Sequence, residues 1–110
     1  MISVTIRRTV KGDLKGFSVS GHALYDRKGK DIVCAAVSVL TINTVNAVEL
    51  LTEDLFSAES DENGGRLSFR FLGDEISDKG RVLLEALVLG LNGIREEYGE
   101  EYLSIVEKEE

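Results

Sequence analysis

The stretch IVCAAVSVLTINTVNAV, residues 32–48, runs for seventeen positions without a charged side chain. Drawn as a helix it is apolar nearly all round, and such a helix either spans a membrane or lies buried in protein. The stretch is only marginally long enough to cross a bilayer, and its Ser, Thr and Asn side chains would be costly in lipid. We therefore expect a central helix buried in a folded domain. A chain of 110 residues has little other structure to cover it, so a subunit interface is expected to help.

Two strands are expected before this helix. Apolar and polar side chains alternate over residues 2–7 and again over residues 17–20, which is the pattern of strands with one buried face. The sequence VKGD between them is typical of a turn, so the pair is predicted to form a hairpin. Residues 23–30 are mostly polar and charged, with Gly29 near their end, and are predicted to form a loop that leads into the helix.

A second hairpin and a second helix are expected after the central helix. The turn sequence DENGG separates two strand-like segments at residues 55–60 and 66–72. A helix is then predicted from a cap at Ser77 to a stop at Gly99. The apolar residues near positions 103–105 indicate a short last strand before the acidic end of the chain.

The element order is therefore β-β-α-β-β-α-β, which predicts an α+β fold with two helices packed on a mostly antiparallel sheet. The length fits a single domain over residues 1–110. Gly90 and Gly93 each disfavour the second helix by ~1 kcal/mol relative to Ala. Close packing against another helix or the sheet would explain both glycines.

Charge and cysteine content restrict the classes of function. Lys and Arg number 13 against 20 Asp and Glu, and the net charge of −7 argues against direct nucleic-acid binding. It favours a basic partner, although a solvated acidic surface without a partner is the simpler alternative. One Cys and one His exclude a disulfide framework and Cys-pair zinc sites, so no metal or cofactor is expected. The absence of a signal-like apolar segment near Met1 and the unpaired Cys predict a cytoplasmic protein without a membrane anchor.

The single Cys occupies a chemically favourable position. Asp31 is a good helix N-cap, which places Cys34 at the third helical position. The N–H groups and the positive end of the helix dipole there favour a thiolate. His22 precedes the loop that leads into the helix, and that loop is long enough to fold back onto the thiol. Nucleophile, base and unpaired helix-start amides would then form a cysteine acyl-transfer site.

The same residues also have purely structural interpretations. A Cys in an apolar helix is often a small core residue, and a His after a strand is often a surface or capping group. Ser38 and Thr41 continue the face of Cys34 along the helix. Their hydroxyls either hydrogen-bond to preceding carbonyls or line a groove that starts at the Cys. The residues alone leave these alternatives open.

Two motifs resemble a known family. The sequences GHA at residues 21–23 and GKDIVCAAVS at residues 29–38 closely resemble the Prp (YsxB-like) family of bacterial ribosomal-processing cysteine proteases. The resemblance extends over essentially the whole chain. It implies an endopeptidase that removes a short N-terminal extension from the twenty-seventh protein of the large ribosomal subunit.

The resemblance also assigns residues. It implies that Cys34 is the nucleophile and His22 the base, while Gly21, Asp31 and Ser38 match the other motif positions as supporting or substrate-binding residues. It further implies a homodimer, and a mobile loop between the His and the Cys that closes over substrate. A basic ribosomal protein as substrate suits an enzyme of net charge −7, because opposite charges steer the encounter.

Two other functions are compatible with the sequence. The first is a non-catalytic ribosome-associated or ribosome-assembly module that binds the same kind of basic partner, with Cys34 as a packing residue and His22 as a structural one. The second is a redox-sensing thiol, which ranks last because the chain has no second Cys to resolve an oxidised sulfur. Thiol alkylation distinguishes these alternatives, since an activated Cys reacts at neutral pH and a core Cys does not.

Overall fold

A computed structural model describes residues 1–23, 25–27, 31–61 and 65–110. Its elements follow the predicted order, which confirms the α+β fold. They are β1 (Ile2–Arg8), β2 (Leu14–Ser20), α1 (Ile32–Leu51), β3 (Phe56–Ser60), β4 (Arg66–Phe71), α2 (Asp78–Tyr98) and β5 (Leu103–Glu109).

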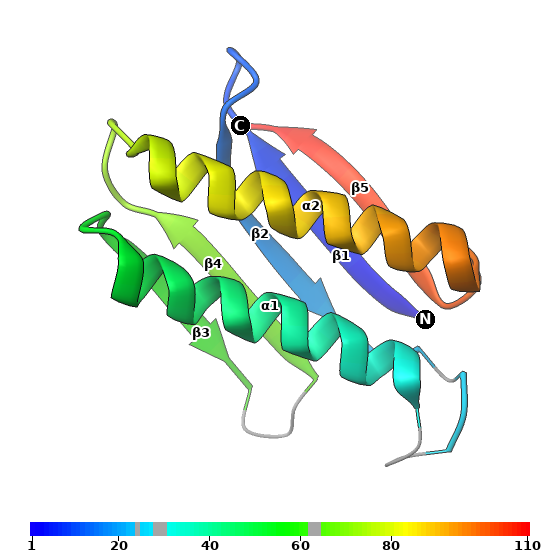
Figure 1. Cartoon of the computed structure of the whole chain (residues 1–110). Helices are drawn as coiled ribbons and strands as arrows, with labels where there is room; N and C mark the ends of the chain where they lie inside the picture. Colours follow the sequence, from blue (N-terminus) through cyan, green and yellow to red (C-terminus); the bar gives the residue numbers. More distant parts are fainter. Residues whose placement is uncertain (24, 28–30, 62–64) are drawn as a thin grey trace.

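The sheet has five strands in the order β3-β4-β2-β1-β5. All neighbouring strands are antiparallel except β1 and β5, which run parallel. Figure 1 shows both helices on the same face of the sheet, with α1 toward β3 and β4 and α2 over β1 and β2. Ile6, Phe17 and Phe69 lie in one row across β1, β2 and β4, and all three are buried. The alternation in the sequence therefore directs its apolar side chains toward the helices.

The last strand is longer than the short one predicted. β5 pairs with β1 over the full length of both strands, from Ile2 opposite Leu103 to Arg8 opposite Glu109. The Arg8 guanidinium also binds the carboxylate of Glu107 at 2.9 Å and that of Glu85 at 3.0 Å. Backbone pairing and these ion pairs draw the acidic end of the chain into the sheet, although its side chains give no strand pattern.

Within one chain α1 is only partly buried, as expected for a helix that so short a chain cannot cover on all sides. The sheet and α2 cover only part of its circumference, so one face is exposed. The buried residues are Val33, Val37, Thr41, Thr44 and Val48, and the exposed apolar residues are Ile32, Val39, Ile42, Leu50 and Leu51. By length and composition α1 is also able to cross a membrane, a property that core helices of folded domains share.

The glycines within α2 and the two ends of α2 can be compared with the predictions from the sequence. Gly90 packs closely on α1 as predicted, because a Cβ there would lie 2.9 Å from Leu40 Cδ1. At Gly93 an added Cβ would meet no described atom of the same chain within 4 Å, so packing within the chain does not explain this glycine. Ser77 caps α2 by accepting the Gly80 N–H, and Gly99 ends it at a φ of +111°. Both predicted ends of α2 are therefore confirmed.

Two predicted segments are only partly described. Within the predicted turn at residues 61–65, positions 62–64 lie outside the described residues. Within the predicted loop at residues 23–30, position 24 and positions 28–30 lie outside them as well. The mobile, closing loop implied by the family resemblance therefore stays a prediction.

Candidate active site

The start of α1 is built by Asp31, as predicted. One carboxylate oxygen, Oδ1, accepts hydrogen bonds from the N–H groups of Val33 and Cys34, both at 3.0 Å. The main-chain carbonyl of Asp31 accepts the N–H of Ala35 at 3.1 Å. Cys34 therefore lies in the first turn of α1, and its side chain is partly exposed.

This cap overturns one expectation about the chemistry. The helix-start amides were predicted to be unpaired and free to hold an oxyanion, but those of Val33 and Cys34 are engaged by Asp31. The group directed at the sulfur is instead the N–H of Ala23, which lies 3.2 Å from Cys34 Sγ. Ala23 itself is buried. No local pattern in the sequence signals this contact.

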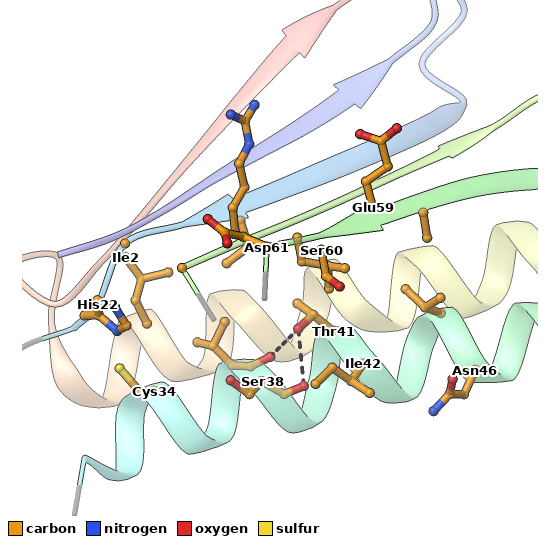
Figure 2. Close-up of a pocket in the computed structure, with 18 residues that line it drawn as sticks. Ile2, His22, Cys34, Ser38, Thr41, Ile42, Asn46, Glu59, Ser60 and Asp61 are labelled. Atoms are coloured by element: carbon orange, nitrogen blue, oxygen red, sulfur yellow. Dashed lines mark hydrogen bonds between the residues drawn. The ribbon is translucent and has the colours of Figure 1, made fainter. Parts of the chain in front are cut away.

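Gly21 turns the chain from β2 toward Cys34. Its φ is +87°, a region that L side chains rarely adopt, and a Cβ there would lie 2.5 Å from the carbonyl oxygen of Met1. Its N–H donates to the carbonyl of Gly65 at 3.0 Å. This turn brings His22 beside the start of α1. Figure 2 shows the His22 imidazole and the Cys34 thiol at the same end of one groove.

The groove has a volume of about 530 Å³ and lies between α1 and the β3–β4 hairpin. Its α1 wall continues from Cys34 through Ser38 to Asn46, as Figure 2 shows. The opposite wall comes from the end of β3 and the start of β4, which the sequence did not identify as part of a site. Its apolar lining comprises Ile2, Val19, Val37, Ile42, Val45, Ala58 and Leu67, and its charged lining comprises Glu59, Asp61 and Arg66.

The two hydroxyl residues next to Cys34 on α1 differ in role. Ser38 is exposed and lines the groove one turn beyond Cys34, in line with the groove interpretation. Thr41 is buried, and its hydroxyl donates to the main-chain carbonyl of Val37 at 2.9 Å. Thr41 therefore fits both interpretations, because it lines the groove while its hydroxyl bonds back to the helix.

Asp31 also binds the loop that carries His22. Its second carboxylate oxygen, Oδ2, accepts the N–H of Tyr25 at 2.9 Å and that of Asp26 at 3.5 Å. Burial favours the protonated form of this carboxyl, but the N–H groups of Cys34, Tyr25 and Asp26 outweigh it and lower the pKa of Asp31 below its usual 3.8. One carboxylate thus joins the helix start to the preceding loop.

Across residues 1–23, 25–27, 31–61 and 65–110, no three His, Cys, Asp or Glu side chains gather to hold a metal ion. The groups assembled around the sulfur are an imidazole, a main-chain N–H, the helix N-terminus and the Asp31 carboxylate, which has a side-chain hydrogen bond with Cys34. A thiol with such neighbours suits nucleophilic chemistry.

Sequence comparison places the chain among cysteine proteases. Residues 1–103 match the profile of the family described as cysteine protease Prp. The ribosomal processing cysteine protease Prp of Staphylococcus aureus is 34% identical over 100 residues, which cover 91% of this chain and 93% of that protein. The protein of the same name from Bacillus subtilis is 34% identical over 101 residues, which cover 89% of this chain and 90% of that protein.

Solved structures agree with the sequence comparison. A crystal structure of an essential ribosomal processing protease Prp from S. aureus, in complex with a covalently linked product peptide, is similar with a TM-score of 0.92 and 32% identity. The similarity covers 98% of this chain and 100% of that chain. A second S. aureus structure, with a substrate peptide, gives a TM-score of 0.85 and 30% identity over 98% of this chain and 100% of that one. The chain therefore belongs to the cysteine protease Prp family.

Proposed function

We propose that this protein is a cysteine endopeptidase that removes a short N-terminal extension from a ribosomal protein, the twenty-seventh of the large subunit. The observation that carries the proposal is the meeting of His22, Cys34 and the Ala23 N–H at one end of a groove. The family relatives named as ribosomal processing proteases support the substrate class.

In the proposed reaction His22 takes the proton of the Cys34 thiol, and the thiolate attacks the scissile peptide carbonyl. The tetrahedral intermediate collapses as the C–N bond breaks, and His22 gives its proton to the leaving amine. A thioester joins the N-terminal fragment to Cys34. His22 then takes a proton from water, whose oxygen attacks the thioester, and the carboxylic acid and the free thiol are released.

The groove suits an extended, partly apolar peptide. Part of its apolar lining lies along one side of α1, and the charged residues Glu59, Asp61 and Arg66 lie on the opposite wall. With a net charge of −7, the protein attracts a basic substrate over distances set by ionic strength. We therefore expect apolar residues of the substrate along α1 and basic residues near the β3 wall.

The direct test is cleavage of a peptide that spans the extension of the organism's own ribosomal protein. C34A is expected to abolish cleavage and leave the fold intact, because Ala suits the first turn of a helix. C34S is expected to be nearly inactive, since an unactivated hydroxyl is a poor nucleophile. H22A is expected to lower turnover by about 10²–10⁴-fold, the usual contribution of a positioned general base. Turnover by C34A at the wild-type rate would refute the proposal.

Alkylation separates the protease from a binding module. A Cys34 thiol coupled to His22 is expected to react with iodoacetamide at neutral pH and to react more slowly in H22A. In a binding module of the same fold, Cys34 would react slowly and H22A would leave that rate unchanged. The comparison uses folded protein in both cases, which circular dichroism verifies.

We also propose that the protein is a cytoplasmic homodimer. Val39 on α1 and Val82 and Leu89 on α2 are each at least 66% exposed on the two-helix layer. A two-fold interface over this layer would cover them, and the bare backbone at Gly93 would permit a close approach. Light scattering at micromolar concentration tests the assembly, and a mass near 12.1 kDa, that of one chain, would refute it.

A further inference from the structure

All three tyrosines of the chain meet in one cluster. The ring of Tyr25 packs edge-to-face on Tyr98, with centroids 5.4 Å apart, and on Tyr102, with centroids 5.0 Å apart. Tyr25 lies in the loop between β2 and α1, Tyr98 is the last residue of α2, and Tyr102 directly precedes β5. The ring contacts therefore join the loop beside the active site to the far end of the sequence.

The backbone of the same loop contacts the reacting groups. The N–H of Ala23 lies 3.2 Å from Cys34 Sγ, and the N–H of Tyr25 lies 2.9 Å from Asp31 Oδ2. Tyr25 is thus held at its ring by the tyrosine cluster and at its backbone by the helix cap. Tyr25 follows Ala23 by two positions in the sequence, so we expect a displacement of Tyr25 to move the N–H that faces the sulfur.

That N–H matters because two main-chain donors in the first turn of α1 are already occupied. The amides of Val33 and Cys34 donate to Asp31 Oδ1. A hydrogen bond to an ionised acceptor is stronger than one to a neutral acceptor, so the Ala23 N–H favours the thiolate over the thiol. The contribution requires the amide to stay directed at the sulfur.

We propose that the main-chain N–H of Ala23 stabilises the Cys34 thiolate, and that Tyr25 is the positioning residue that holds it there through Tyr98 and Tyr102. The inference rests on the proposed function in one respect, that Cys34 is the nucleophile. It assigns Tyr25 a role in activating the thiol without contact to the sulfur.

The test is the rate of Cys34 alkylation by iodoacetamide as a function of pH, in wild type, Y25A and Y25F. Y25A is expected to react about fivefold to tenfold more slowly at neutral pH, as expected for the loss of one or two edge-to-face ring pairs. Its rate profile is expected to move to higher pH. Y25F keeps the ring and is expected to react within about twofold of wild type. Iodoacetamide is too small to need the groove, so a lost substrate contact does not produce this result.

Two controls address folding and location. Tyr25 is 41% exposed, so its truncation leaves the core unchanged. The chain has no Trp, and the near-UV tyrosine circular dichroism therefore reports on the cluster alone. This signal is expected to fall in Y25A while the far-UV spectrum is retained. Leu50, 78% exposed at the other end of α1, supplies a matched truncation, and L50A is expected to react as wild type does.

The outcomes separate this inference from the proposed function. If wild type cleaves the precursor peptide, C34A does not, and Y25A is alkylated like wild type across the pH range, the positioning role is refuted and the protease stands. If Y25F is as slow as Y25A, the hydroxyl and not the ring is responsible, which also refutes the role assigned to ring packing. Failure of wild type itself to cleave the peptide would refute the proposed function.

Discussion

Replacement of Asp31 by Asn separates the two tasks of this carboxylate. In the wild type Oδ1 accepts the N–H groups of Val33 and Cys34, and Oδ2 accepts that of Tyr25 at 2.9 Å. Asn caps helices as well as Asp does, so D31N is expected to keep the cap. Its amide NH₂ donates and does not accept, so the hydrogen bond from Tyr25 is lost.

The expected magnitudes follow from the number of hydrogen bonds removed. D31N loses one good hydrogen bond to a charged acceptor and the weaker contact with Asp26 at 3.5 Å. The free energy that holds the loop in place is expected to fall by about 1–2 kcal/mol. This corresponds to alkylation of Cys34 and peptide turnover that are slower by about fivefold to thirtyfold. D31A loses the helix cap as well. Its free energy of unfolding is expected to be about 1 kcal/mol lower than that of D31N, and its Tm lower by about 4–8 °C.

Thermal unfolding and iodoacetamide kinetics on the same samples measure the two effects. D54N is the matched control, because Asp54 accepts the N–H and hydroxyl of Ser77 at the opposite end of α1. It is expected to lower Tm and leave the alkylation rate unchanged. The reasoning would be refuted if D31N reacted as fast as wild type, or if D54N slowed the thiol as much as D31N does.

Three further predictions concern the turn before His22, acid stability and the dimer. G21A is expected to lower the free energy of unfolding by about 1–3 kcal/mol, because Gly21 has a φ of +87° and its added Cβ would meet the Met1 carbonyl. An unchanged denaturation midpoint would contradict this. The carboxyls of Asp31 and Asp54 are buried enough to favour protonation, yet hydrogen bonds hold the pKa of each below its usual 3.8. The stability that these two carboxylates contribute is therefore complete above that pH and is lost as pH falls through their folded-state pKa values. In the double variant D31N/D54N, the free energy of unfolding should therefore decrease less steeply in acid than it does in wild type. L89E is expected to convert the dimer to monomers in light scattering, since it places a charge on the apolar two-helix layer; an unchanged mass would place the interface elsewhere.

Periodicity and end signals predicted the fold well, because they are local. Alternation over β1 and β2, the DENGG turn, and the caps at Asp31 and Ser77 each depend on a few neighbouring residues, and the structure has the predicted elements. The extent of β5 was missed because its pairing with β1 comes from the backbone and not from side-chain pattern. The incomplete cover of α1 was expected from the length of the chain, but which of its apolar residues are exposed was not, because composition does not show where the neighbours of a helix lie.

In the candidate site too, local features were predicted and contacts between distant segments were not. The positions of His22, Asp31 and Cys34 were visible in the sequence as a loop flanked by a His and a capped Cys. The Ala23 amide and the tyrosine cluster depend on contacts between distant segments, so no sequence motif reports them. The prediction of unpaired amides was wrong for Val33 and Cys34, because the side chain of Asp31, the residue that signals the helix start, accepts both of their N–H groups.

The proposed function is tested most directly by the mass of the organism's own precursor ribosomal protein after incubation with this protein. Wild type is expected to yield a single product, shorter at the N-terminus by the extension, while C34A leaves the precursor at full mass. An intact precursor with wild type, or the same product with C34A, would contradict the assignment of this chain as a ribosomal-processing protease that acts through Cys34.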